Sequence, residues 1–110
     1  MLFRSDLYQA RQEIKKIRSL LSVAKIDAVA FQTDIEAFFE KSRSGYIFYL
    51  KTDHPALTCL SQYRSGLELK HLKQIARPTR LTMTSSGWVF PDSFFKLFFK
   101  NKTEIIKPLD

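Results

Sequence analysis

The uninterrupted aromatic and aliphatic run Tyr46–Leu50 constrains the fold of this chain more than any other segment. Aromatic and β-branched side chains favour a pleated, half-buried backbone, so this run predicts a strand. A strand needs neighbours to pair with and a layer that covers its apolar face. The chain must therefore supply further strands and an amphipathic helix. Its 110 residues allow one domain, or two small lobes that share a core.

Three patterns precede this strand. Apolar residues recur at spacings of three and four across Ser5–Ser22, which predicts an amphipathic helix that begins at Ser5. The short apolar run Ile26–Phe31 predicts a strand. Thr33 is followed three residues later by Glu36, a capping-box pattern that predicts a second helix over Thr33–Ser42.

The second half of the chain alternates short apolar runs with turn residues. Phenylalanines at every fourth position from Phe90 predict a helix, with Phe95 and Phe99 beside them. We expect a tight turn at Gly66, because glycine accepts the positive φ that a hairpin needs. The remaining runs predict strands at Leu57–Tyr63, Leu67–Ala76, Leu81–Thr84 and Thr103–Ile106.

This order of elements predicts an α+β fold with largely antiparallel sheets. We expect an N-terminal α-β-α-β-β lobe over residues 1–63. It would pack on a small C-terminal β-rich lobe over residues 64–110, which contains one helix and would bind RNA. No apolar run is long enough to span a membrane, and no signal peptide is visible.

The net charge of +7 is distributed unevenly along the chain. Residues 1–40 contain six basic and six acidic residues, whereas residues 41–110 contain twelve basic and five acidic residues. The whole excess therefore lies in the second part. Such a balance is typical of proteins that bind polyanions. A protein that merely has a basic surface is the plainer interpretation.

The residue patterns of common catalytic and metal sites are missing. Cys59 is the one cysteine, which excludes an intrachain disulfide and fits a reducing compartment. We interpret it as a small apolar residue within a strand. His54 and His71 have no partner at metal-ligand spacing, and there is no glycine-rich phosphate loop. We therefore predict no enzyme activity, metal, cofactor or small-molecule substrate.

One stretch does carry residues suited to a phosphate backbone. Arg77 and Arg80 flank Pro78, which stiffens the segment, and arginine matches phosphate oxygens with forked donors. Thr84, Ser85, Ser86 and Gly87 follow, and add hydroxyls and a position where a ligand can approach the backbone. A plain turn is the better explanation of the second group when it is considered alone, and only the joint order of the two groups favours phosphate binding.

The order of motifs resembles the small-subunit ribosomal protein eight family. That family has an opening helix that ends in Ile-Arg-Asn-Ala and a helix that ends in Gly-Tyr-Ile. A strand that ends in Lys-Tyr, a turn with glycine, an Ile-Ser-Arg-Pro-Gly-x-Arg motif and a Ser-Thr-Ser-Lys-Gly loop follow. Corresponding residues here are Ile17–Leu20, Gly45–Ile47, Gln62-Tyr63 with Gly66, Ile75–Arg80 and Met83–Gly87. The resemblance covers about residues 10–107.

This chain departs from the family in its second half. Only three residues separate Arg80 from Thr84, where the family has a further strand and connection. Met83 and Ser86 replace the family's first serine and its lysine, and Asn101-Lys102 stands near the place of its paired glycines. A shortened copy of this kind implies an organellar ribosome, most simply mitochondrial, with another organelle or the bacterial cytoplasm as alternatives.

The resemblance implies a structural protein of the small ribosomal subunit. Its family binds the central domain of the small-subunit rRNA beside neighbouring ribosomal proteins and helps that domain assemble. By position, Thr84, Ser85, Ser86 and Gly87 would make the specific loop contact, with Arg77 and Arg80 on adjacent phosphates. Lys16 and Arg18 of the first helix are further candidates. No membrane partner is expected.

The alternative is a small basic accessory protein. It would bind a protein partner or an anionic membrane through the Phe-rich helix at Phe90–Phe99, whose apolar stripe is accompanied by Lys96 and Lys100. Core packing explains the same stripe, because a small domain needs such a helix.

Overall fold

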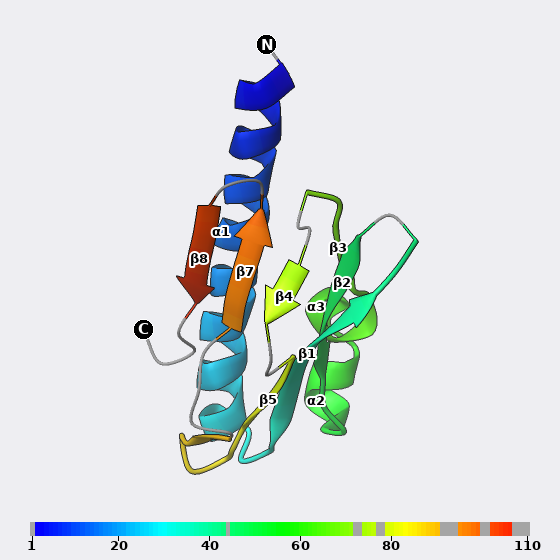
Figure 1. Ribbon diagram of the computed structural model, residues 1–110. Coiled ribbons are helices and arrows are strands. Elements are labelled where there is room, and N and C mark those ends of the chain that lie inside the picture. The colour runs from blue at the N-terminus through cyan, green and yellow to red at the C-terminus, as the bar shows by residue number, and fades with distance from the viewer. Residues whose placement is uncertain are drawn as a thin grey trace.

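The protein has an α+β fold, as predicted, in which one long helix lies along two antiparallel sheets (Figure 1). The computed structural model describes residues 2–43, 45–71, 74–76, 79–90, 95–99 and 102–106. In chain order the elements are α1 (Leu2–Ala30), β1 (Ile35–Lys41), β2 (Tyr46–Lys51), α2 (Pro55–Thr58), α3 (Ser61–Arg64), β3 (Leu67–Leu69), β4 (Gln74–Ala76), β5 (Arg80–Met83), β6 (Val89–Phe90), β7 (Phe95–Phe99) and β8 (Lys102–Ile106).

Helix α1 is longer than the sequence pattern predicted. The expected strand at Ile26–Phe31 is wrong, because the buried stripe of the helix continues through Ala24 and Ala28. Ile26 is instead exposed on the outer side. The helix ends in a Schellman motif: Gln32 adopts a positive φ of 50°, and the Thr33 N–H donates to the Ala28 carbonyl at 3.0 Å.

Strand β1 replaces the helix that was predicted over Thr33–Ser42. Ile35, Ala37 and Phe39 are buried and the residues between them are not, which is the period of a strand. The capping-box prediction fails because the Thr33 N–H closes the end of α1. β1 is the central strand of the sheet β3-β2-β1-β5-β6.

The strand predicted at Tyr46–Leu50 is confirmed as β2, which pairs antiparallel with β1 and places Phe48 opposite Phe39. Gly45 precedes it with a φ of 153°, and a Cβ there would collide with the Leu69 carbonyl oxygen. Only glycine therefore fits where β3 approaches the start of β2.

Gly45→Ala should lower the free energy of unfolding by about 2 kcal/mol, because the new methyl group meets backbone atoms in a conformation that favours glycine. Urea denaturation of the variant measures the loss. Ser42→Ala is the control, since its backbone bond to Gly45 remains and a change within about 0.5 kcal/mol is expected. Equal stability of the two variants would contradict the close packing at Gly45.

The strand predicted at Leu57–Tyr63 is wrong, because two single-turn helices occupy this segment. His54 caps α2 by accepting the Ala56 N–H at its Nδ1, and Pro55 suits the first helical position. Leu57 faces the core, whereas Cys59 is exposed rather than buried in a strand. The predicted strand Leu67–Ala76 is divided into β3 and β4, which belong to different sheets.

The remaining strands complete both sheets. β5 confirms the strand predicted at Leu81–Thr84, and β8 confirms the one at Thr103–Ile106. The Phe-rich helix is wrong where the structure describes it, because residues 95–99 form β7. Phe95 and Leu97 are buried and Lys96 is exposed, so burial alternates with a period of two. Residues 91–94 lie outside the described residues.

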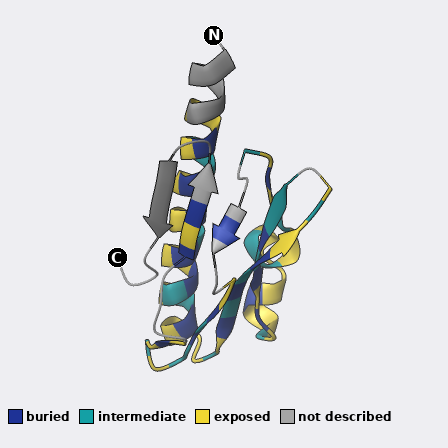
Figure 2. Cartoon of the chain, viewed as in Figure 1, coloured by how far each residue is buried: buried dark blue, intermediate teal, exposed yellow. Residues whose placement is uncertain are grey.

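The core lies between α1 and the two sheets (Figure 2). The Phe95 ring of β7 contacts the rings of Phe39 and Phe48, with centroids 4.7 and 6.4 Å away, and so connects the sheet β4-β7-β8 to the larger one. The larger sheet takes strands from both sides of the expected lobe boundary at residues 63–64, since β1 pairs with β5 and β2 pairs with β3.

A candidate nucleic-acid interface

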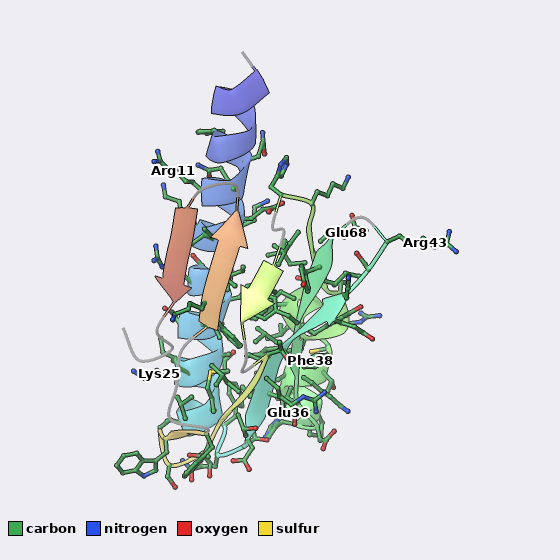
Figure 3. All side chains as sticks on the ribbon, viewed as in Figure 1. Arg11, Lys25, Glu36, Phe38, Arg43 and Glu68 are labelled. Atoms are coloured by element: carbon green, nitrogen blue, oxygen red, sulfur yellow. The ribbon has the colours of Figure 1, made fainter. Side chains whose placement is uncertain are left out.

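Helix α1 presents a row of cations on one flank. Arg11, Arg18 and Lys25 are seven residues apart, and Lys15 lies one turn beyond Arg11. At about 100° per residue, these four side chains fall on the same side of the buried stripe. We call them the basic flank. Figure 3 shows Arg11 and Lys25 extending from the same side of the helix.

The opposite flank of α1 carries Glu13 and Asp27, the two acidic residues of the helix whose side chains are described, and each makes a tertiary contact. Glu13 accepts the backbone N–H groups of Lys70 and His71, at 2.9 and 3.3 Å. Asp27 accepts the Tyr63 hydroxyl at 2.6 Å. Among the side chains described from residue 8 to residue 30, no carboxylate falls on the basic flank. The basic flank therefore carries positive charge alone in this range, whereas the opposite flank is mixed, since Lys16 lies on the side of the two carboxylates.

The bond between Tyr63 and Asp27 also fixes α3 to α1. Burial and the neighbouring carboxylate together raise the pKa of Tyr63 well above its ordinary value of 10.0. An unfolded chain therefore loses this proton at lower pH than the folded chain, so the contribution is complete below pH 10 and declines as pH rises above it.

Tyr63→Phe should lower the free energy of unfolding by about 1 kcal/mol at neutral pH, because Asp27 loses its donor. Urea denaturation at neutral and alkaline pH tests both effects. The wild-type protein should lose more stability than the variant between neutral pH and pH above 10. Parallel losses in the two proteins would show that the hydroxyl does not hold its proton in the fold.

The basic flank borders a shallow hollow of about 210 Å³. Arg11, Lys15 and Arg18 line it together with the buried Ile14. Seven residues advance about 10 Å along a helix, so Arg11 and Lys25 are separated by about 21 Å. This length suits contacts with several consecutive phosphates and exceeds the size of one small anion.

The predicted contact loop Thr84–Gly87 is the turn of the β5–β6 hairpin. The Thr84 N–H donates to the Trp88 carbonyl at 2.8 Å, and Gly87 adopts a φ of 89°. The Ser85 N–H donates to Asp34 Oδ1 at 3.0 Å. The Gly87 and Trp88 N–H groups both donate to Thr84, to its carbonyl and its hydroxyl oxygen. The backbone N–H groups of this loop that are named above therefore already donate to acceptors within the protein. The carboxylate of Asp34 lies beside the loop.

Arg80 lies on the face of the larger sheet that points away from α1. Its guanidinium stacks 4.8 Å from the centre of the Phe38 ring, and Phe38 in turn stacks on Tyr49 at 5.2 Å. Arg80 Nη1 lies 3.5 Å from Glu36 Oε1. The side chain remains 61% exposed, so this ion pair is weak. Arg77 lies outside the described residues.

The structure does not bring the sequence-predicted residues into one site. Lys16 and Arg18 are both exposed, but they stand roughly 160° apart around α1. Ser86 is exposed at the hairpin turn, and Arg80 stands at the far end of β5 from that turn. Of the predicted set, Arg18 alone belongs to the basic flank.

Sequence reasoning missed three of the four residues on the basic flank. Arg11, Lys15 and Lys25 were not singled out, although the seven-residue spacing from Arg11 to Lys25 is visible in the sequence. The seven-residue repeat was incomplete in the predicted helix, because that helix was expected to end near Ser22, before Lys25. With α1 extended to Ala30, the row becomes continuous.

Other chemical groups in the described residues do not assemble into a site. No group of three or more histidine, cysteine or acidic residues there is placed to hold a metal ion. His54 is occupied as the cap of α2, and its ring packs edge-on against Phe31. No helix in the described part of the chain is long and apolar enough to cross a membrane.

No protein-family model matches this chain, and neither does any curated protein or solved structure. The ribosomal resemblance therefore depends on the quoted residues alone. Three of the elements that gave its order, at Ile26–Phe31, Thr33–Ser42 and Leu57–Tyr63, have a different secondary structure.

Proposed function

We propose that this chain is a non-catalytic RNA-binding protein that holds a phosphate backbone along the basic flank of α1. One observation carries the proposal: the helix places Arg11, Lys15, Arg18 and Lys25 on one flank and uses both of its described carboxylates on the other. Over residues 8–30 the helix carries five basic and two acidic residues, and four of the five basic residues lie on the flank that has no carboxylate. The result is a cationic row on a rigid support.

The chemistry of the basic flank suits RNA. Arginine and lysine contact phosphate oxygens directly, and a row of them displaces counterions from a polyanion. RNA helices present shape, phosphates and ribose hydroxyls more readily than base edges, and single strands add unpaired bases. The net charge of +7 strengthens the attraction over longer distances.

The narrower form of the proposal places the protein in the small ribosomal subunit, bound to the small-subunit rRNA among neighbouring ribosomal proteins. A mitochondrial ribosome is the first location to test. This form rests on the motifs Gly45–Ile47, Ile75–Arg80 and Met83–Gly87, and not on the order of elements.

The alternative function depended on a Phe-rich helix that would bind a protein partner or a membrane, and the described part of that segment contains no helix. The described part of that segment is a strand, and Phe95 and Leu97 face the core. Phe90, which begins the predicted stripe, is exposed instead.

A salt titration tests RNA binding. Fluorescence anisotropy with a short labelled single-stranded RNA should show affinity falling about fiftyfold from about 50 to about 200 mM salt, as expected when about four phosphates are neutralised. Salt-independent binding, or no binding at low salt, would contradict the proposal. Co-sedimentation with small ribosomal subunits in a sucrose gradient tests the narrower form, which fails if the protein stays at the top.

A further inference from the structure

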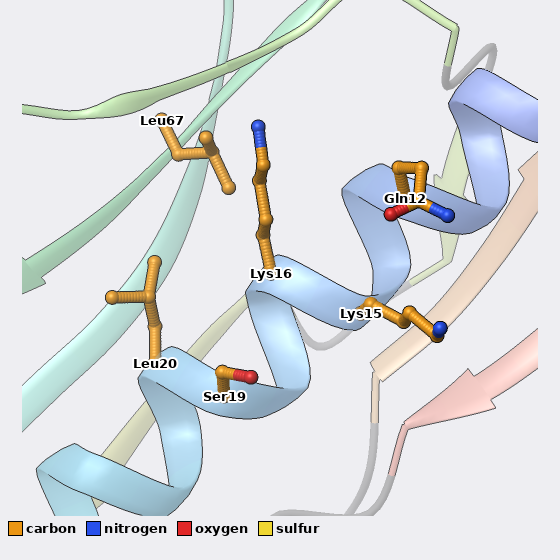
Figure 4. Close-up of a pocket in the computed structure, with 6 residues that line it drawn as sticks. All are labelled: Gln12, Lys15, Lys16, Ser19, Leu20 and Leu67. Carbon is orange, nitrogen blue, oxygen red and sulfur yellow. The ribbon is translucent and has the colours of Figure 1, made fainter.

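A second hollow, of about 390 Å³, lies on the outer side of α1 next to the basic flank (Figure 4). Its volume is in the range of small-molecule sites. It extends from the helix to β3 and is lined by Gln12, Lys15, Lys16, Ser19, Leu20 and Leu67.

The hollow combines an apolar wall with polar groups. Leu20 and Leu67 pack against the buried core and remain partly exposed, so they form the apolar wall. Figure 4 shows the Lys16 side chain rising beside Leu67, and the Ser19 hydroxyl beside Leu20. The Gln12 amide lies about two turns away along the helix; both groups donate and accept hydrogen bonds.

Lys15 connects the hollow to the basic flank, because it lines both this hollow and the smaller one between Arg11 and Arg18. The nearest described acidic residue of α1, Glu13, accepts two backbone N–H groups from the loop after β3. That contact holds Lys70, which is exposed, at the same side of the helix. The surroundings of the hollow are therefore cationic.

We propose that this hollow receives an unpaired nucleotide of the RNA strand whose phosphates lie on the basic flank. The inference rests on the proposed function and deepens it: the preferred RNA is single-stranded at this point. A base fits because it offers a flat apolar face to Leu20 and Leu67, and a hydrogen-bonding edge to Ser19 beside them. Lys15 and Lys16 meet the phosphates on either side of it.

The test compares two RNA oligomers of equal length in anisotropy titrations at one salt concentration. One oligomer carries bases throughout, and the other is abasic at its central positions, so both have the same phosphates. The wild-type protein should bind the complete oligomer about tenfold more tightly. Ser19→Leu, which narrows the hollow with a side chain that cannot stack on a base and leaves the basic flank unchanged, should remove most of this preference.

Ser61→Leu on α3 is the matched control and should keep the full preference, because Ser61 is exposed and does not line the hollow. Equal binding of the two oligomers by the wild type would overturn the inference and leave phosphate binding intact. A full preference in Ser19→Leu would also overturn it. If neither oligomer binds, the proposed function itself fails, so the two failures are distinct.

Discussion

Replacing Arg11 and Lys25 together by glutamate should abolish most RNA binding. Both side chains belong to the basic flank, at positions separated by about four turns of α1. Losing two phosphate contacts should lower the salt slope of log affinity by about 1.4. The two new carboxylates also repel the strand, so affinity should fall at least about tenfold at moderate salt. Anisotropy titrations of both proteins over a salt series measure the two effects.

The matched control is Arg43→Glu with Arg64→Glu. Each replacement of a cation by glutamate lowers the net charge by two, so both double variants change from +7 to +3. Arg43 and Arg64 are both exposed. Arg43 follows β1, and Figure 3 shows it on the side of the sheet far from α1. Arg64 ends α3, which contacts the flank of α1 opposite the basic flank through Tyr63 and Asp27. The control should lose little affinity. Equal losses in the two variants would mean that net charge alone attracts RNA, which would contradict a defined interface.

Phe95→Ala should cause the largest loss of stability, about 3–5 kcal/mol. The ring is fully buried and is the aromatic contact between β7 and the strands β1 and β2, through Phe39 and Phe48. Its removal leaves a cavity that two separate sheets cannot readily close. Urea denaturation monitored by the fluorescence of Trp88 gives the free energy of unfolding.

The neighbouring residue provides the control. Lys96→Ala, on the exposed side of the same strand, should change stability by less than about 0.5 kcal/mol. The alternation between the two positions distinguishes a strand from the helix that the phenylalanine spacing suggested. Comparable losses for the two variants would contradict the burial pattern of β7.

Two of the errors in element type, the helices predicted at Thr33–Ser42 and at Phe90–Phe99, have the same physical source. A spacing of four residues fits a helix, but it is also twice the period of a strand. Ile35 and Phe39 in β1 have this spacing, and so do Phe90, Phe94 and Phe98 in the sequence around β7. In β1 the deciding residue is Ala37, which is buried between them but is too small to register as an apolar signal.

Tertiary contacts decided the other differences. Ile26–Phe31 contains enough apolar residues for a strand, yet Ala24 and Ala28 continue the buried stripe of α1, and Ile26 is left exposed. Pro55 after the cap His54 suits the start of a helix, whereas the apolar run that follows it predicted a strand. Contiguous strong signals, as in β2, were predicted correctly, because both faces of that strand are at least half-covered.

The sequence predicted the chemical class of the partner, a polyanion, but not the surface that forms the candidate site. The basic excess indicated a polyanion partner, yet that excess lies in residues 41–110, whereas the basic flank belongs to the formally neutral residues 1–40. The count hid the flank because the six acidic residues of this segment include three that follow α1, whereas Glu13 and Asp27 of the helix face away from the basic flank. Only the placement of α1 against β3 and α3 shows that these carboxylates are engaged.

Photochemical crosslinking tests the central claim most directly. A single-stranded RNA that contains 4-thiouridine would be bound to the wild-type protein, irradiated and digested, and the crosslinked peptides would be identified by mass spectrometry. The basic flank predicts that crosslinks concentrate between Arg11 and Lys25. Crosslinks confined to the hairpin around Thr84–Gly87 and Arg80, with none on α1, would contradict it.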